Sequence, residues 1–148
     1  MTFSKNFEPI WADMDPNQHM RHTAYNNYAA QVRVVFFHSI GMGYEEMETR
    51  RLGAVLFRED THFVREIRLG DTIRIDLEIS GLSADGRFWN LTHHIYKNED
   101  KLSAVIYIEG GWIHMDKRKI ITPPEEILKK LQALPRSNDF REIVKNKS

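Results

Sequence analysis

The most regular pattern in the sequence is an alternation of apolar and polar side chains over residues 72–80. Its apolar face consists of Ile73, Ile75, Leu77 and Ile79. A period of two residues predicts an antiparallel strand that is buried on one face and exposed on the other. Residues 54–64, 87–97 and 102–115 also predict strands, and short turn-like segments separate them. The sequence therefore predicts a meander of neighbouring antiparallel strands.

Residues 23–39, which precede these strands, have apolar side chains at spacings of three and four, and this predicts a helix. The positions are Ala24, Tyr25, Tyr28, Val32, Val35 and Phe36. The second half of the helix is apolar on much of its circumference, so we expect it to be buried on more than one side. Shorter helices are expected at residues 44–51 and at about 123–134, with a polar tail after residue 135.

Together with a first strand at residues 3–12, the order of elements is β-α-β-β-β-β-α. This order indicates an α+β fold in which a curved antiparallel sheet of about five strands surrounds one long central helix. Gly110 and Gly111 lie inside the last strand and indicate a bulge or a strong bend. The chain has 148 residues and no repeat or linker, so residues 1–148 are expected to form a single domain.

Charge and composition exclude several classes of protein. Lysine plus arginine equals aspartate plus glutamate, so the chain lacks the basic excess expected of a protein that binds nucleic acid or a membrane surface. The absence of cysteine excludes disulfides, thiolate metal sites and a cysteine nucleophile. No segment has the apolar length of a membrane helix, and the N-terminus does not resemble a signal peptide. We therefore expect a cytoplasmic protein.

The densest group of reactive side chains lies in residues 13–25, where a polar loop leads into the central helix. Its candidate functional residues are Asp15, Asn17, His19, His22 and Tyr25. The start of a helix presents unpaired N–H groups and a positive dipole end, which together stabilise a negatively charged oxygen. A carboxylate beside it can act as a nucleophile or as the base that activates water. The loop is therefore suited to the hydrolysis of a thioester.

The same residues carry a resemblance to a known family. The segment Trp-Ala-Asp-Met-Asp-Pro at 11–16, followed by His19, His22 and Tyr25, resembles the opening motif of the 4-hydroxybenzoyl-CoA thioesterase family. The segment Ile-Arg-Leu-Gly-Asp at 67–71 resembles a second motif of that family. Asn-Gln-His at 17–19 is also similar to a motif of plant acyl-ACP thioesterases. The resemblance extends over nearly the whole chain.

This resemblance implies a hot-dog fold and the hydrolysis of an acyl thioester, with CoA or acyl carrier protein as part of the substrate and no separate cofactor. It also implies a homodimer or homotetramer whose subunits share their sites. Asp15 corresponds to the family's catalytic aspartate, and the backbone N–H of His22 would join the oxyanion site. Asn17 and His19 would hold and polarise the reacting groups, and Tyr25 would shape the pocket. Many relatives have glycine where this chain has Gln18, so the loop is expected to differ there.

Several alternatives remain open at this level. Glu59 is expected on an otherwise apolar strand face with Val55, Phe57, Thr61 and Phe63, where it would either contact the site of a neighbouring subunit or mark a bulge. His19 and His22 have no further ligand at matching spacing, so no metal site is expected. A hot-dog hydratase or dehydratase is one rival function, although its Asp-x-Asn-Pro-x-His pattern differs from the loop here. The other rival is a protein that binds acyl-CoA without catalysis.

Overall fold

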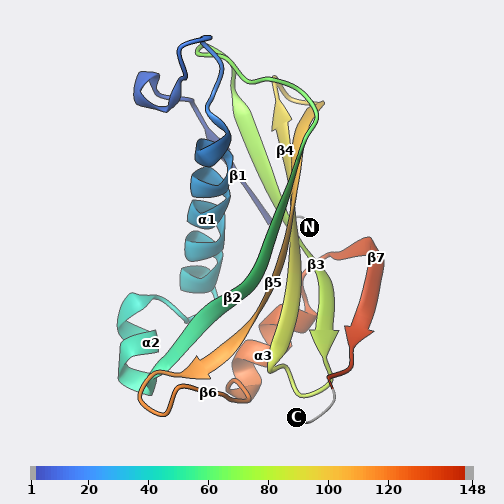
Figure 1. Cartoon of the computed structure of the whole chain (residues 1–148). Coiled ribbons are helices and arrows are strands. Elements are labelled where there is room, and N and C mark those ends of the chain that lie inside the picture. The colour runs from blue at the N-terminus through green and yellow to red at the C-terminus, as the bar shows by residue number, and fades with distance from the viewer. Residues whose placement is uncertain (1–2, 146–148) are drawn as a thin grey trace.

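The computed structural model describes residues 3–145. Three α-helices and a mixed sheet account for most of this part of the chain (Figure 1). The helices are α1 (His22–Ser39), α2 (Tyr44–Arg50) and α3 (Glu125–Gln132). The strands are β1 (Phe3–Phe7), β2 (Leu52–Phe63), β3 (Ile73–Ser83), β4 (Phe88–Lys97), β5 (Lys101–His114), β6 (Lys119–Ile120) and β7 (Arg136–Ile143). No helix in residues 3–145 has the length and apolar character needed to cross a membrane.

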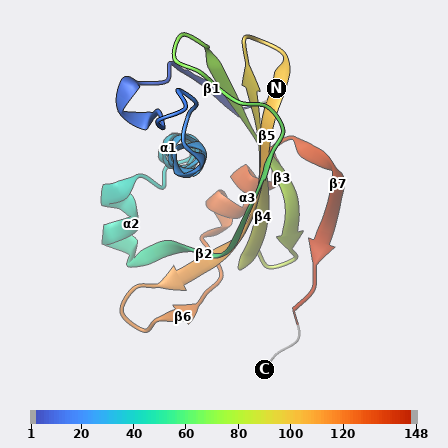
Figure 2. The same ribbon diagram turned by 45° about the horizontal axis from the view of Figure 1, so that its top comes forward.

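The main strands follow the order β1-β3-β4-β5-β2, and all neighbours in this path are antiparallel. Viewed along α1, the sheet curves around the helix on one side (Figure 2). β3 has the expected alternation, with Ile73, Ile75, Leu77 and Ile79 all buried. β3, β4 and β5 form the predicted meander, but β2 pairs with β5 at one edge of the sheet and not with β3, so the predicted place of residues 54–64 beside β3 is wrong.

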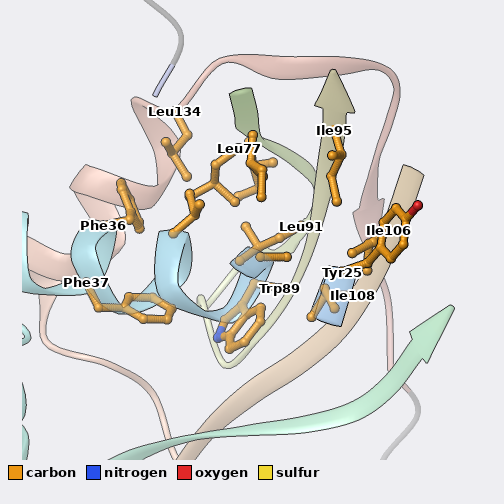
Figure 3. Close-up of a cluster of buried hydrophobic side chains, with 14 of the residues drawn as sticks. Tyr25, Phe36, Phe37, Leu77, Trp89, Leu91, Ile95, Ile106, Ile108 and Leu134 are labelled. Carbon is orange, nitrogen blue, oxygen red and sulfur yellow. The ribbon is translucent and has the colours of Figure 1, made fainter. Parts of the chain in front are cut away.

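The core lies between the concave face of the sheet and α1. Phe37 of α1 packs against Trp89 of β4, with ring centroids 6.0 Å apart (Figure 3). Phe37 also packs against Trp112 of β5, with ring centroids 5.4 Å apart. Seven residues of α1 are buried, namely Ala24, Tyr25, Ala29, Val32, Arg33, Phe36 and Phe37. Because the sheet curves around a long helix that buries one side against it, the predicted α+β hot-dog fold is confirmed.

The two ends of the chain differ from the prediction. β1 ends at Phe7, and Trp11–Asp13 form a 3-10 turn rather than the end of a strand. Pro9 lacks the N–H that a ladder requires, which accounts for the early end. The expected polar tail after residue 135 is instead strand β7, parallel to the second half of β3. Phe140 of β7 packs against the core, and Arg136 lies over its ring at 4.2 Å. Phe140 and Ile143 are thus the two apolar side chains of a strand that is otherwise polar.

Gly110 and Gly111 of β5 do not form a bulge in their own strand. Their lack of a side chain instead allows neighbouring groups to approach the backbone closely. A Cβ atom on Gly110 would lie 2.4 Å from the Trp89 ring and 2.6 Å from the carbonyl oxygen of Val55. The register shift lies opposite, in β2 between Leu56 and Arg58, so the extra residue is Phe57. A bulge of this kind reverses the alternation of the side chains that follow it.

The prediction that Glu59 shares one face of the strand with Val55, Phe57, Thr61 and Phe63 is therefore partly wrong. Leu56 lies beside α1, whereas Phe57 packs against Phe88 on the opposite face of the sheet, with ring centroids 6.1 Å apart. Beyond the bulge, Glu59 and Thr61 both contact Asn26 of α1, so these two residues share one face, as predicted. Glu59 thus faces the helix without sharing that face with Phe57.

Candidate active site

Residues 14–20 form a tight loop that resembles a small hairpin. Met14 and Met20 pair across it, and the N–H of Asp15 donates to the carbonyl of His19 at 2.8 Å. The N–H of Gln18 donates back to the carbonyl of Asp15 at 2.9 Å. Gln18 has φ 66°, in the left-handed region that favours glycine. Gln18 thus adopts the turn conformation that a glycine would adopt more easily.

The carboxylate of Asp15 is held at one oxygen only. Its Oδ1 accepts hydrogen bonds from the N–H of Asn17 at 2.9 Å and from the N–H of His19 at 3.0 Å. Within residues 3–145, Oδ2 has no hydrogen-bond partner. The carboxylate is therefore oriented by the backbone, while its second oxygen is free to accept a proton or to attack a carbonyl carbon.

Asp13, the other acid of the loop, fixes the loop to the helix. Its Oδ2 accepts a 2.6 Å hydrogen bond from the hydroxyl of Tyr28, and its Oδ1 lies 3.3 Å from Nη2 of Arg21. Burial and the hydrogen bond to this carboxylate raise the pKa of Tyr28 to about 12. With both oxygens engaged, Asp13 serves as a structural acid, and the two aspartates of the loop have different surroundings.

His19 contacts a residue that the sequence does not single out. Its Nε2 lies 2.8 Å from Oε2 of Glu66, in the segment between β2 and β3. Backbone contacts hold the two segments together, because the N–H of Met20 donates to the carbonyl of Ile67 at 2.7 Å. Glu66 lies in a charge-rich run, and nothing local in that run distinguishes it from a solvated acid. Only the folded structure brings it to His19.

Tyr25 and His22 lie on the first turns of α1. The helix begins one residue earlier than predicted, at His22, with Arg21 as its N-cap and no side-chain cap. The N–H groups of His22 and Thr23 are therefore at the open end, where a helix supplies no acceptor of its own. Tyr25 is buried, and its ring meets Phe63 edge-on at 5.0 Å. Burial, together with the charges of Glu66 and Asp15, raises the pKa of Tyr25.

A hollow of about 670 Å³ opens beside the loop. Asp15 and Gln18 form part of its wall, and Arg68 lies at its border. Two apolar side chains that also line it, Trp11 and Leu69, are 80% and 55% exposed. An exposed aromatic ring and an exposed leucine are suited to the apolar part of a ligand, and Arg68, which contacts Glu66 at 3.0 Å, adds a cation to the wall.

The structure thus brings most of the predicted residues together. Asp15, Asn17 and His19 share one loop, and Tyr25 lies close enough for the charge of Asp15 to act on it. The side chain of His22 is exposed at the helix start. Glu59 is separate, because it accepts a 2.9 Å hydrogen bond from Asn26 and lies 3.7 Å from Nη2 of Arg33. Glu59 therefore belongs to a polar group farther along the helix.

Comparison with known proteins identifies relatives of this architecture. A model of the thioesterase-like superfamily matches residues 10–131. A hypothetical protein from Staphylococcus aureus, solved in complex with CoA, is similar with a TM-score of 0.84 and 22% identity over 93% of this chain and 89% of that chain. No match is found among curated proteins.

Two enzymes of known substrate are also similar in structure. A 1,4-dihydroxy-2-naphthoyl-CoA thioesterase from Synechocystis has a TM-score of 0.80 and 16% identity, over 90% of this chain and 98% of that chain. A DHNA-CoA thioesterase from Staphylococcus aureus has a TM-score of 0.79 and 18% identity, over 97% of this chain and 99% of that chain. At these identities the likeness establishes a shared fold.

Proposed function

Because the chain belongs to the thioesterase-like superfamily, we propose that it hydrolyses an acyl thioester to a free acid and a thiol. The observation that carries this proposal is the carboxylate of Asp15, with Oδ1 held by two backbone N–H groups and Oδ2 without a partner in residues 3–145. Asp15 borders an open hollow at the loop that leads into α1. Such an arrangement combines a fixed base with the N–H groups of a helix start.

The proposed reaction needs only water and the thioester. Asp15 takes a proton from water as the water oxygen attacks the thioester carbon; alternatively it attacks that carbon itself, and after the thiolate has left, water hydrolyses the resulting acyl-aspartate anhydride to the free acid and restores the carboxylate. The carbonyl oxygen gains negative charge, which the N–H groups of His22 and Thr23 stabilise; one donor of this kind is typically worth about a hundredfold to a thousandfold in rate. The C–S bond then breaks, and the sulfur leaves as a thiolate that takes up a proton.

Asn17 and His19 have supporting roles in this proposal. Their N–H groups hold Oδ1 of Asp15, so that Oδ2 alone is presented to the reacting atoms. Glu66 fixes the ring of His19 through the 2.8 Å contact at Nε2. Arg68 and Trp11 border the hollow where the pantetheine arm of CoA or of acyl carrier protein would lie. The CoA complex of the Staphylococcus aureus relative supports CoA as the first thiol to test.

The test is free-thiol release from a panel of acyl-CoA esters, from short to long aliphatic chains and including aromatic acyl groups. We expect one class of ester to be hydrolysed with a kcat/KM in the ordinary enzyme range, about 10⁴ M⁻¹s⁻¹ or more. If no CoA ester and no acyl carrier protein ester releases thiol while the intact esters bind, the protein is a binding protein and the proposal is wrong. Hydration of an enoyl ester without thiol release would instead identify a lyase.

We further propose that the active form is a homodimer joined through β2. This strand is 12 residues long and lies at an edge of the sheet, and Leu56, Phe57 and Phe63 on it are exposed. The first half of this strand is apolar and its edge is not covered by another strand, so it can pair with a further strand. We expect sedimentation equilibrium to give twice the 17.5 kDa mass of one chain. A monomer at micromolar concentration would contradict this proposal without affecting the chemistry proposed for Asp15.

A further inference from the structure

Gln18 occupies a position in the loop where glycine folds more easily. The N–H of Asp15 donates to the carbonyl of His19, and the N–H of Gln18 donates to the carbonyl of Asp15, so residues 16–18 form a three-residue hairpin loop. The last residue of such a loop has a left-handed backbone and is usually glycine. Gln18 has φ 66°, which is unfavourable for a residue with a side chain. The loop thus carries a side chain where folding alone favours none.

The side chain of Gln18 has no structural contact that would offset this strain. It is exposed and forms no side-chain hydrogen bond within residues 3–145. Two other residues with a left-handed backbone differ in this respect. Arg51 contacts Asp116 at 2.6 Å, and the side-chain oxygen of Asn98 accepts from the N–H of Thr72 at 3.1 Å. Strained backbone without a structural reason is typical of ligand sites, so the surroundings of the Gln18 amide indicate its role.

Gln18 lines the same hollow as Asp15. Most of the other side chains of that wall are apolar, and its one cation, Arg68, already contacts Glu66 at 3.0 Å. Of the side chains that line the hollow in the described part of the chain, Gln18 alone is an amide, with both a donor and an acceptor. The wall therefore offers one neutral group that can pair with an amide of a ligand.

The turn sets Gln18 close to the group that attacks the thioester. Asp15 and Gln18 are the first and fourth residues of a turn, so their Cα atoms lie within about 7 Å of each other. In a thioester of CoA or of acyl carrier protein, two methylene groups separate the sulfur from the first amide of the thiol arm. A side chain that binds this amide must therefore lie next to the residue that acts on the thioester carbon, as Gln18 does.

We infer that the side-chain amide of Gln18 binds the amide next to the sulfur in the thiol arm of the substrate, and so positions the thioester at Asp15. This inference rests on the proposed thioesterase function and adds a specificity-determining residue on the thiol side of the bond. Gln18 takes no proton and attacks no atom. Its side chain selects thiols that carry an amide at this distance over thiols of the same length without one.

The experiment compares two thioesters of one acyl group. The thiol is N-acetylcysteamine in one and 2-mercaptoethyl acetate in the other, where an oxygen replaces the amide N–H. The ratio of their kcat/KM values is measured for the wild type, Gln18→Gly and Gln18→Ala, so that differences in the leaving groups cancel. We expect both variants to lower this ratio about fivefold to tenfold, the value of one hydrogen bond. If the ratio is unchanged, or if both esters are slowed equally, Gln18 does not bind the amide and the inference is overturned.

Arg118→Gly is the matched control for the backbone. Arg118 is exposed and has φ 56°, and its N–H donates to the carbonyl of His114 at 2.8 Å in the turn between β5 and β6. This turn lies at the opposite end of the molecule from the start of α1 (Figure 1). Arg118→Gly and Gln18→Gly should both raise Tm, because glycine adopts this backbone without strain, whereas Arg118→Gly should leave the ratio unchanged. A Gln18→Gly variant with a lower Tm would show that the side chain holds the loop, which would overturn the inference.

A binding measurement separates this inference from the proposed function. Calorimetry with CoA, the thiol product, requires no catalysis. If no ester is hydrolysed but CoA binds, and both Gln18 variants weaken this binding about fivefold or more, the proposed hydrolysis fails and the role of Gln18 stands. If esters are hydrolysed and the variants change neither the ratio nor the affinity for CoA, the role of Gln18 fails and the hydrolysis stands. If no ester is hydrolysed and CoA does not bind, both are wrong.

Discussion

Asp15→Asn is expected to lower kcat/KM for the best acyl-CoA ester by about a hundredfold or more, with a much smaller change in KM. Asparagine has nearly the same shape, and its side-chain oxygen can still accept from the N–H groups of Asn17 and His19. The free oxygen, however, becomes an NH₂ group that can neither take a proton from water nor attack the thioester. The loop is thus preserved and the chemistry is removed. Steady-state thiol release by both proteins measures the effect.

Asp13→Asn is the matched control, because the two acids lie two residues apart in one loop. Asp13 accepts from Tyr28 and contacts Arg21, so its loss should reduce the free energy of unfolding by about 1–3 kcal/mol. Its effect on kcat/KM of the folded protein should be less than about tenfold, well below that of Asp15→Asn. If Asp15→Asn keeps more than a tenth of the activity, or if Asp13→Asn is the more damaging change, Asp15 is not the catalytic base or nucleophile.

The second large effect concerns stability in acid. His93 is fully buried, and its pKa is lowered from 6.5 to about 3 by burial and, secondarily, by the charge of Arg33. Between pH 6.5 and 3 the unfolded chain therefore binds a proton at His93 that the folded protein does not bind. The stability contributed by neutral His93 is present above pH 6.5 and is lost as the pH falls toward 3. This residue alone should account for about 1.4 kcal/mol of unfolding free energy per pH unit in that window.

His93→Gln tests this assignment. A glutamine amide can accept from Arg33 and donate to the carbonyl of Asp76, but it cannot take up a proton. Urea unfolding at a series of pH values should give a curve for the variant that falls less steeply than the wild-type curve below pH 6.5. At pH 8 both side chains are neutral, so the difference there measures the packing cost alone. Parallel curves from pH 8 to pH 4 would show that His93 is not responsible.

Local periodicity accounts for the parts of the fold that the sequence predicts well. The alternation in β3 and the three-and-four spacing in α1 depend on which side chains face the core, and both patterns are visible within about ten residues. β7 has no such pattern, since its two apolar side chains, Phe140 and Ile143, lie three residues apart and its partner β3 lies more than fifty residues earlier. The bulge at Phe57 is similar, because the cause lies in another strand, where Trp89 occupies the space beside Gly110.

The residues of the candidate site also differ in whether the local sequence predicts them. Asp15, Asn17 and His19 lie within five residues, so their motif is readable in the sequence, and the backbone of the loop brings them together. Glu66 and Asn26 are found only through contacts between distant segments, with His19 and with Glu59.

The strand at the C-terminus affects how copies of the protein can associate. β1 covers β3 from Ile73 to Leu77, and β7 covers it from Ile79 to Ser83. Both covering strands are short, and β7 presents charged side chains, so this side of the sheet is a poor template for a further strand. If β2 is the edge strand that pairs readily, two copies of the protein join through it about a twofold axis. Assembly then stops at the dimer, because neither copy has a second edge strand that pairs readily. The second half of β3 is thereby protected from fibrous, end-to-end assembly.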